Sequence, residues 1–247
     1  MSQDAAAPLE PQPGPFDVLL NLFVEPRTAF AAILKRPGGF WIPITGAVLL
    51  NIVFTAIWMQ KMDAQQFIRN EIEQSGRGAQ IPPERMEAVV DQQAKMVKII
   101  SPISAVVAPP LIILLFGGLF LFVYRFFYGG ELGFKQSVAV VAWSSLAIAL
   151  VSIPIMLAVY AGKGDWNLNP QNVVQANLSL LLDRESTSRA LWSLAESIDL
   201  FTAWMLFLLA TGYGLAIRKP TSAALWGVVI PWALYVVVKT GLVALMS

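Results

Sequence analysis

Residues 196–217 read ESIDLFTAWMLFLLATGYGLAI, and residues 221–246 read TSAALWGVVIPWALYVVVKTGLVALM. Each run is about long enough to cross the roughly 30 Å hydrocarbon core of a bilayer. Between the two runs stand Arg218, Lys219 and Pro220, which form a short polar break. The pattern predicts a transmembrane helical hairpin, and the rest of the chain repeats it.

The composition indicates a membrane protein along the whole chain. Apolar residues make up 56% and charged residues 13% of it, whereas soluble domains carry about 25% charged residues. The net charge of +1 gives no field that would attract nucleic acid. Because the chain has neither cysteine nor histidine, disulfides, thiolate metal sites and histidine general bases are excluded. We therefore expect no catalytic residue, no cofactor and no metal, and no enzymatic activity.

Five apolar segments predict an all-α, polytopic bundle of five transmembrane helices. They cover about residues 40–59, 103–124, 137–160, 199–217 and 223–246. Pro109 and Pro110 in the second segment and Pro154 in the third predict kinked helices, because proline removes a backbone donor. Such breaks line transport sites in some proteins, and in others they only serve packing.

Three further segments surround the spans. Residues 1–15 are rich in alanine and proline and predict a disordered tail. Residues 16–36 carry apolar side chains on one helical face and basic ones on the back, which predicts helices in the membrane interface or packed against the membrane domain. Residues 61–98 hold six bases and six acids, and they predict an extramembrane helical hairpin that runs into the second span. This hairpin is either a solvated excursion that packs on itself or a docking surface for a partner.

The distribution of cations predicts the orientation in the membrane. With a cytoplasmic N-terminus, three cytoplasmic segments carry cations at the span ends. These cations are Arg27, Lys35 and Arg36, then Arg125 and Lys135, and then Arg218 and Lys219. The two longer polar connections would lie outside, and five crossings would place the C-terminus outside as well.

Four polar residues are the candidate functional residues. Asn51 lies near the middle of the first span, where an amide either bonds to a neighbouring helix or lines a polar pathway. Asp199 and Lys239 each lie about 20 positions from the Arg218 turn, so at about 1.5 Å per residue they reach similar depth near the outer interface. Three interpretations stay open for Lys239: an ion pair with Asp199 or Glu196, snorkelling to water, or a transport or proton-relay role.

Three short pieces of sequence resemble one family in their order and spacing. VEPRTAF at 24–30 precedes Trp-Ile-Pro in the first span, FKQS at 134–137 leads into VVAWSS at 140–145, and SIDLFTAW at 197–204 precedes GYG at 212–214. Together they resemble the Yip-one domain family, in its bacterial-type branch, over about residues 16–246.

The resemblance implies a five-span α-helical membrane protein with a cytosolic N-terminus and no catalytic residues. Eukaryotic members associate with Rab-type GTPases in membrane traffic, so a small GTPase is a partner here only by distant analogy. The other expected partners are the lipid bilayer, another membrane protein and a second copy of the chain. The bacterial-type branch implies a bacterial inner membrane.

Two functions remain. The first is a non-enzymatic membrane scaffold that organises partners or lipids through its N-terminal helices and its outer hairpin. It predicts that polar residues in the spans pair off in a dry bundle. The second is a small transporter or channel-like protein that uses the proline-broken spans with Asn51, Asp199 and Lys239. It predicts a continuous wet cavity that reaches the middle of the bilayer.

Overall fold

The computed structural model describes residues 13–75, 78, 81–183 and 186–245, and its long elements are all helices. In chain order they are α1 (Pro15–Val24), α2 (Pro26–Lys35), the 3-10 helix η1 (Pro37–Phe40), α3 (Trp41–Lys61), α4 (Ala64–Gln74), α5 (Pro83–Phe126), α6 (Phe134–Lys163), the 3-10 helix η3 (Leu178–Leu181), α7 (Arg189–Glu196), α8 (Leu200–Ala216) and α9 (Thr221–Leu245). The predicted all-α class is confirmed. Most of the predicted tail, residues 1–12, and the last residue of the predicted fifth span, 246, lie outside the described residues.

Four helical segments are long and apolar enough to cross a membrane. They are Pro37–Lys61, Pro83–Phe126, Phe134–Lys163 and Thr221–Leu245. The remaining predicted span corresponds to α8, which has 17 residues. At about 1.5 Å per residue α8 covers about 25 Å, somewhat less than the roughly 30 Å hydrocarbon core. The protein is therefore a multi-pass helical membrane protein with four candidate spans, and a fifth crossing by α8 stays a prediction.

Helix α6 forms the centre of the bundle. It contacts α1, α2, η1, α3, α5 and α8, and residues 137–144 are buried. Two glycines let neighbouring helices approach it closely. A Cβ atom on Gly117 of α5 would lie 2.7 Å from the Val138 side chain, and one on Gly212 of α8 would lie 2.6 Å from the Val140 side chain. Any larger residue at these glycines would push α5 or α8 away from α6.

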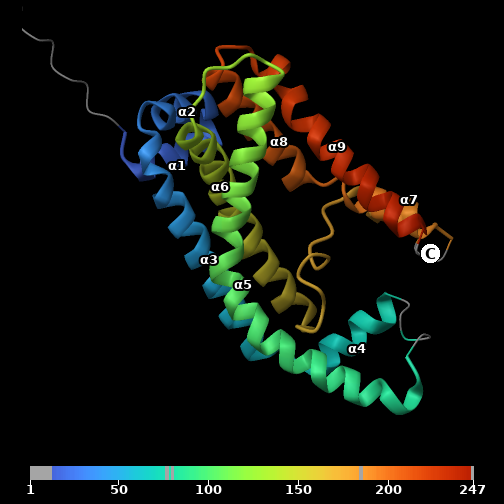
Figure 1. The fold of residues 1–247 in the computed structure, drawn as a ribbon. Helices are drawn as coiled ribbons and strands as arrows, with labels where there is room; N and C mark the ends of the chain where they lie inside the picture. The colour runs from blue at the N-terminus through green and yellow to red at the C-terminus, as the bar shows by residue number, and fades with distance from the viewer. Residues whose placement is uncertain (1–12, 76–77, 79–80, 184–185, 246–247) are drawn as a thin grey trace, which may run out of the picture.

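Helix α5 is continuous over 44 residues, although Pro102, Pro109 and Pro110 lie inside it. Each proline removes one backbone donor from the helix. Figure 1 shows that α5 changes direction along its length, so that its C-terminal part runs beside α6 and its N-terminal part turns toward α4. The predicted extramembrane hairpin and the second candidate span are thus joined by one helix.

The N-terminal helices α1 and α2 pack against the membrane domain. Leu22 of α1 and Phe30 of α2 are fully buried, and α2 contacts both α6 and α8. The outer side of α1 is apolar and exposed, with Phe16 and Leu20 on it. The inner faces of α1 and α2 are therefore packed against the membrane domain, which is one of the two predicted arrangements. That their outer faces lie in the membrane interface stays a prediction.

The two ends of the bundle differ in charge. The cationic end gathers the start of the chain, the α5–α6 connection and the α8–α9 turn (Figure 1), which are residues 13–40, 125–137 and 216–222. A contact joins the second and third of these segments, since the Lys219 ammonium lies 5.7 Å from the centre of the Tyr128 ring. Together they carry seven cations and three carboxylates. The three segments predicted to face the cytoplasm therefore share one end, and the two long polar connections occupy the other, polar end.

Candidate functional site

Two of the four predicted polar residues form local hydrogen bonds. The Asn51 amide donates to the Ala47 carbonyl at 2.9 Å, one turn back in its own helix. The Glu196 carboxylate accepts a hydrogen bond of 2.8 Å from the Trp192 indole, also one turn away. Neither bond reaches a neighbouring helix, so the interhelical bonding predicted for Asn51 is not seen among the contacts of the described residues.

Asp199 and Lys239 line the same cavity. The Asp199 carboxylate accepts the backbone N–H of Thr202 at 2.9 Å and also the Thr202 hydroxyl, which makes it the N-cap of α8. The Lys239 ammonium donates to the Ser197 hydroxyl at 3.1 Å. Among the described residues, no nitrogen–oxygen contact within 4.0 Å joins Lys239 to Asp199 or Glu196. The structure thus gives Lys239 a hydroxyl partner, and the predicted ion pair stays a prediction.

The backbone around Asp199 is held in place by a second segment of chain. The N–H of Leu178 donates to the Ile198 carbonyl at 3.1 Å, and the N–H of Leu200 donates to the Ala176 carbonyl at 3.2 Å. These bonds form an antiparallel bridge that places Asn177 opposite Asp199. The carboxylate of Asp199 is therefore positioned both by its own helix and by the connection before η3.

The shared cavity has a volume of about 590 Å³ and lies between α5, α6, α8 and α9. Apolar side chains such as Phe116, Leu209 and Val228 form most of its walls. Its charged groups, Asp199 and Lys239, gather at the polar end of α8 and α9, near the hydroxyls of Ser197 and Thr202. The cavity is therefore amphipathic, with a charged end at Asp199 and Lys239, which we call its mouth, and a mostly apolar interior.

Helices α5 and α9 meet near the cationic end and diverge from there toward the polar end (Figure 1). At the meeting point, the Tyr124 hydroxyl donates to the Ala224 carbonyl at 2.6 Å. A Cβ atom on Gly227 would lie 2.7 Å from the Tyr124 ring, so the two helices touch there. Below this contact the cavity opens between the two helices.

A buried tyrosine cluster, Tyr124, Ser137 and Tyr213, lies behind the deep end of the cavity, where Tyr213 packs on the lining residue Phe120. The rings of Tyr124 and Tyr213 stack at 4.4 Å between centroids. The hydroxyls of Ser137 and Tyr213 lie 2.8 Å apart, and Ser137 donates to the Gly117 carbonyl at 2.6 Å. This cluster was not among the residues predicted from the sequence. The signal was available, because a tyrosine inside an apolar span needs a partner for its hydroxyl.

A smaller cavity of about 250 Å³ lies on the other side of Asp199. It lies between α6, the connection before η3 and the start of α8, and Glu196 and Asn177 line it. Asp199 thus borders both cavities, whereas Glu196 borders only the smaller one and Lys239 only the larger one.

At the polar end, α4 and the first part of α5 form the predicted helical hairpin. The Asp63 side chain caps α4. Across the hairpin, Arg69 forms an ion pair of 2.7 Å with Glu87, and Gln65 donates to Asp91 at 2.5 Å. The bond to Glu87 and the charge of that carboxylate raise the pKa of Arg69 above its ordinary value. The polar faces of the two helices are thereby joined outside the apolar spans.

The apolar side of the hairpin packs on itself and on the adjoining helix ends. Its buried members are Ala64, Phe67, Ile68, Ile72, Val90 and Ala94. The self-packing that the sequence analysis considered for a solvated excursion is therefore found. It leaves the charged residues on the outer side of the hairpin.

The second polar connection, after α6, is bonded to the hairpin. The Asn167 side chain accepts the backbone N–H of Asp63 at 2.8 Å, and its carbonyl accepts the Asn70 amide at 3.2 Å. The Trp58 indole donates to the Trp166 carbonyl at 3.0 Å. We call this combined unit the polar platform, which comprises the described residues 62–75, 78, 81–98 and 163–174.

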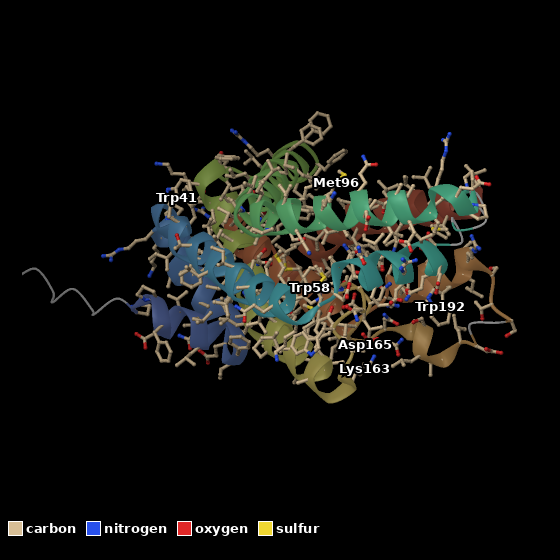
Figure 2. All side chains as sticks on the ribbon, turned by 90° about the horizontal axis from the view of Figure 1, so that it is seen from below. Trp41, Trp58, Met96, Lys163, Asp165 and Trp192 are labelled. Carbon is tan, nitrogen blue, oxygen red and sulfur yellow. The ribbon has the colours of Figure 1, made fainter. Side chains whose placement is uncertain are left out.

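Figure 2 shows the molecule from the side of the polar end. Trp58, Lys163 and Asp165 lie close to α4 there, and the nitrogen and oxygen atoms of side chains gather around the same region. A further bond of 2.9 Å joins the Asn169 amide to Glu71 of α4. The platform is therefore a surface whose segments are held together by hydrogen bonds.

The described residues contain no group of three or more His, Cys, Asp or Glu side chains that could hold a metal ion. The Ser144 hydroxyl is buried, and no hydrogen-bond partner for it is found in the described part of the chain. Ser145, beside it, lines the larger cavity. A serine becomes a nucleophile only with an adjacent base, so this pair offers no recognisable hydrolytic site.

Comparison with known proteins gives one match. The family model of the Yip1 domain matches residues 20–242, which is nearly the whole chain. No curated protein and no solved structure matches the chain. The family match covers the first three candidate spans, the fourth as far as residue 242 and the polar platform, and the residues that line both cavities lie within it.

Proposed function

Because the chain belongs to the Yip1 domain family, whose members are generally non-enzymatic membrane proteins, we propose that it is a membrane scaffold that organises partners at its polar end. Membership of this family confirms the resemblance in the sequence. The protein is a multi-pass integral membrane protein. Its assignment to the bacterial-type branch and its lack of catalytic activity are parts of this proposal.

The polar platform is the observation that carries the scaffold proposal. Hydrogen bonds such as Asp63–Asn167 and Trp58–Trp166 join segments that lie about a hundred positions apart in the chain. The outer side presents both signs of charge, including the exposed Glu73, Glu84 and Lys95. A surface that is already ordered loses less conformational entropy when it binds a partner. The platform therefore suits recognition.

The hydrogen bonds of the intramembrane polar residues also support a scaffold. Asn51 bonds to its own helix, and Lys239 bonds to Ser197. The deep part of the larger cavity has mostly apolar walls, which do not hold a column of water. These features match the dry bundle that the scaffold interpretation predicts.

The scaffold proposal is tested by crosslinking in native membranes. The double substitution Glu73→Lys and Glu84→Lys reverses two exposed charges of the platform without touching a buried residue. Its matched control is Glu131→Lys at the cationic end. We expect the partner crosslinked to the wild type to be lost from the platform variant and kept by the control, at equal thermal stability. Crosslinks that are equal in all three proteins would contradict the proposal.

We place the N-terminus in the cytoplasm and the polar platform outside, in a bacterial inner membrane, with α8 as a fifth crossing. Support comes from the seven cations of the cationic end, since cytoplasmic span ends favour lysine and arginine. The natural absence of cysteine permits a direct test. A membrane-impermeant maleimide should label Ser75→Cys in intact cells, and it should label Glu131→Cys only after lysis. The reverse pattern would invert the orientation.

A small transporter is the second candidate, because Asp199 borders both cavities. If this carboxylate connects a pathway, proteoliposomes should carry a proton or alkali-cation flux above that of empty vesicles. Asp199→Asn and Lys239→Met should then remove the flux at unchanged thermal stability, while Lys163→Met, which lies outside both cavities, should keep it. The absence of any wild-type flux would favour the scaffold.

A further inference from the structure

The larger cavity combines an apolar interior, a charged mouth and an opening between two diverging helices. We propose that it binds one phospholipid whose headgroup carries a primary ammonium. One acyl chain lies between α5 and α9, the phosphate lies at Lys239, and the ammonium lies at Asp199. This site is separate from the polar platform, so it stands or falls independently of the scaffold proposal.

The depth of the cavity matches one leaflet of a bilayer. Lys239 at the mouth and Val228 near the closed end are eleven positions apart in α9, which is about 16 Å along the helix. Asp199 and Leu209 mark a similar span of about 15 Å along α8. Half of the roughly 30 Å hydrocarbon core is about 15 Å. The cavity therefore extends from the headgroup boundary to the middle of the membrane.

The walls of the cavity favour an acyl chain over water. The lining residues from α5 and most of those from α9 are apolar, so water in the interior would find few hydrogen-bond partners. The volume of about 590 Å³ falls within the range of about 300–1,000 Å³ of small-ligand sites. Beyond the deep end, the hydroxyl of Tyr124 joins α5 to α9 by its bond to the Ala224 carbonyl. The space therefore suits part of one lipid molecule.

Lys239 provides a site for a phosphate. Its ammonium has three donors, and Ser197 accepts one of them at 3.1 Å. Within the described part of the chain, no carboxylate lies within 4.0 Å of this ammonium. A charge-assisted hydrogen bond to a phosphate oxygen would use the remaining donors in a place where an unpaired charge is costly.

Asp199 selects the other half of the headgroup. Its carboxylate accepts two hydrogen bonds from Thr202, and a carboxylate has about four acceptor sites in all. A primary ammonium donates to the sites that remain. A quaternary ammonium has no N–H to donate, and an anionic headgroup without an amine would bring like charge to the carboxylate. One cation and one carboxylate at the mouth thus match a zwitterion with donor N–H groups.

The two charged residues are also positioned before any ligand binds. Asp199 is fixed by the cap of α8 and by the backbone bridge to Asn177. Lys239 lies on α9, which packs against α7. Groups that are already held in place lose less conformational entropy on binding. More of their interaction energy is then left to distinguish one headgroup from another.

Native mass spectrometry of the purified full chain tests the proposal. The protein is offered phosphatidylethanolamine, phosphatidylcholine or phosphatidylglycerol with identical acyl chains. We expect one retained phosphatidylethanolamine, bound about tenfold more tightly than either other lipid, because hydrogen bonds to charged groups distinguish them. Equal retention of all three lipids, or retention of none, would overturn the proposal.

Four substitutions separate the roles of the two charges. Asp199→Asn keeps a good helix cap but removes the carboxylate, so the preference for phosphatidylethanolamine should disappear. Lys239→Met should weaken all three lipids about tenfold, since each carries a phosphate. The matched controls Glu196→Gln and Lys163→Met change the same charges outside this cavity and should behave as wild type. A preference that survives Asp199→Asn would also overturn the assignment.

A fifth substitution tests the acyl-chain site without changing a charge. Ser145→Phe places a ring into the cavity from α6 and should reduce the retention of phosphatidylethanolamine at least about tenfold, through steric exclusion. The thermal unfolding of each variant is measured alongside, so that lost binding is compared only among folded proteins. Undiminished retention in a folded Ser145→Phe protein would place the lipid elsewhere and contradict the site.

Discussion

Helices α5 and α9 are packed tightly at one end of the bundle and separated at the other. At the cationic end Tyr124 reaches across to Ala224 and packs on Gly227. Toward the polar end the same two helices diverge (Figure 1), and both line the larger cavity there. The candidate spans also differ in burial, since 56% of the most apolar stretch of α6 is buried inside the protein, against 11% for that of α9.

The difference shows how one short chain provides both rigidity and space. Small residues and buried hydroxyls bring helices together where the tyrosine cluster lies, and their bonds hold the bundle in register. Farther down α9, large apolar side chains face outward and no such cluster exists among the described residues. The proposed lipid would fill this opening in a bilayer. We therefore expect the closed half to maintain the fold and the open half to interact with the membrane.

The largest expected effect comes from breaking the closed half at Gly212. In Gly212→Ala the new methyl group would lie 2.6 Å from Val140 and 3.0 Å from Phe30. Overpacking of this kind costs about 1–3 kcal/mol. Gly241→Ala in α9 is the matched control, because no heavy atom lies within 4 Å of its added methyl group. Thermal unfolding in detergent should show a loss of stability for Gly212→Ala alone. Equal losses of stability in both variants would contradict the difference between the closed and open halves.

A smaller effect is expected from the hydroxyl of Tyr213. Tyr213→Phe removes its contact with Ser137 at 2.8 Å while keeping the buried ring. The loss of one buried hydrogen bond should lower the free energy of unfolding by about 0.5–1.5 kcal/mol. Tyr235→Phe on the open half is the control, since Tyr235 is 64% exposed, and it should unfold as the wild type does. If Tyr213→Phe has the same free energy of unfolding as the wild type, the ring contacts alone would hold the helices together here.

The smallest effect is expected at the polar platform, where Arg69 pairs with Glu87. This pair is exposed to solvent, so its contribution is small and screened by salt. A double-mutant cycle of Arg69→Gln and Glu87→Gln should give a weak favourable coupling at low salt that vanishes at high salt. A coupling that resists salt would show that the platform depends on this pair more than on its bonds to Asn167.

The extent of sequence-based prediction differs between the spans and the site. The long spans are predictable because a run of apolar residues is a local feature of the sequence. Helix α3 therefore begins at Trp41 and α6 ends at Lys163, close to the predicted bounds. The partner of Lys239 was not predictable in this way. Counting residues from the α8–α9 turn placed Lys239 level with Asp199, but a hydrogen bond also depends on side-chain direction, and the ammonium donates to Ser197 instead.

The sequence by itself determined the helical class, the membrane location, the family and the grouping of cations. Each depends on composition, on the length of apolar runs or on short motifs, and the bilayer allows helices few alternatives. Only the tertiary structure decided that α1 and α2 pack inward, that the hairpin joins the second polar connection, and that α5 and α9 diverge. These features depend on contacts such as Tyr124 with Gly227, between residues a hundred positions apart. A local sequence pattern does not specify such contacts.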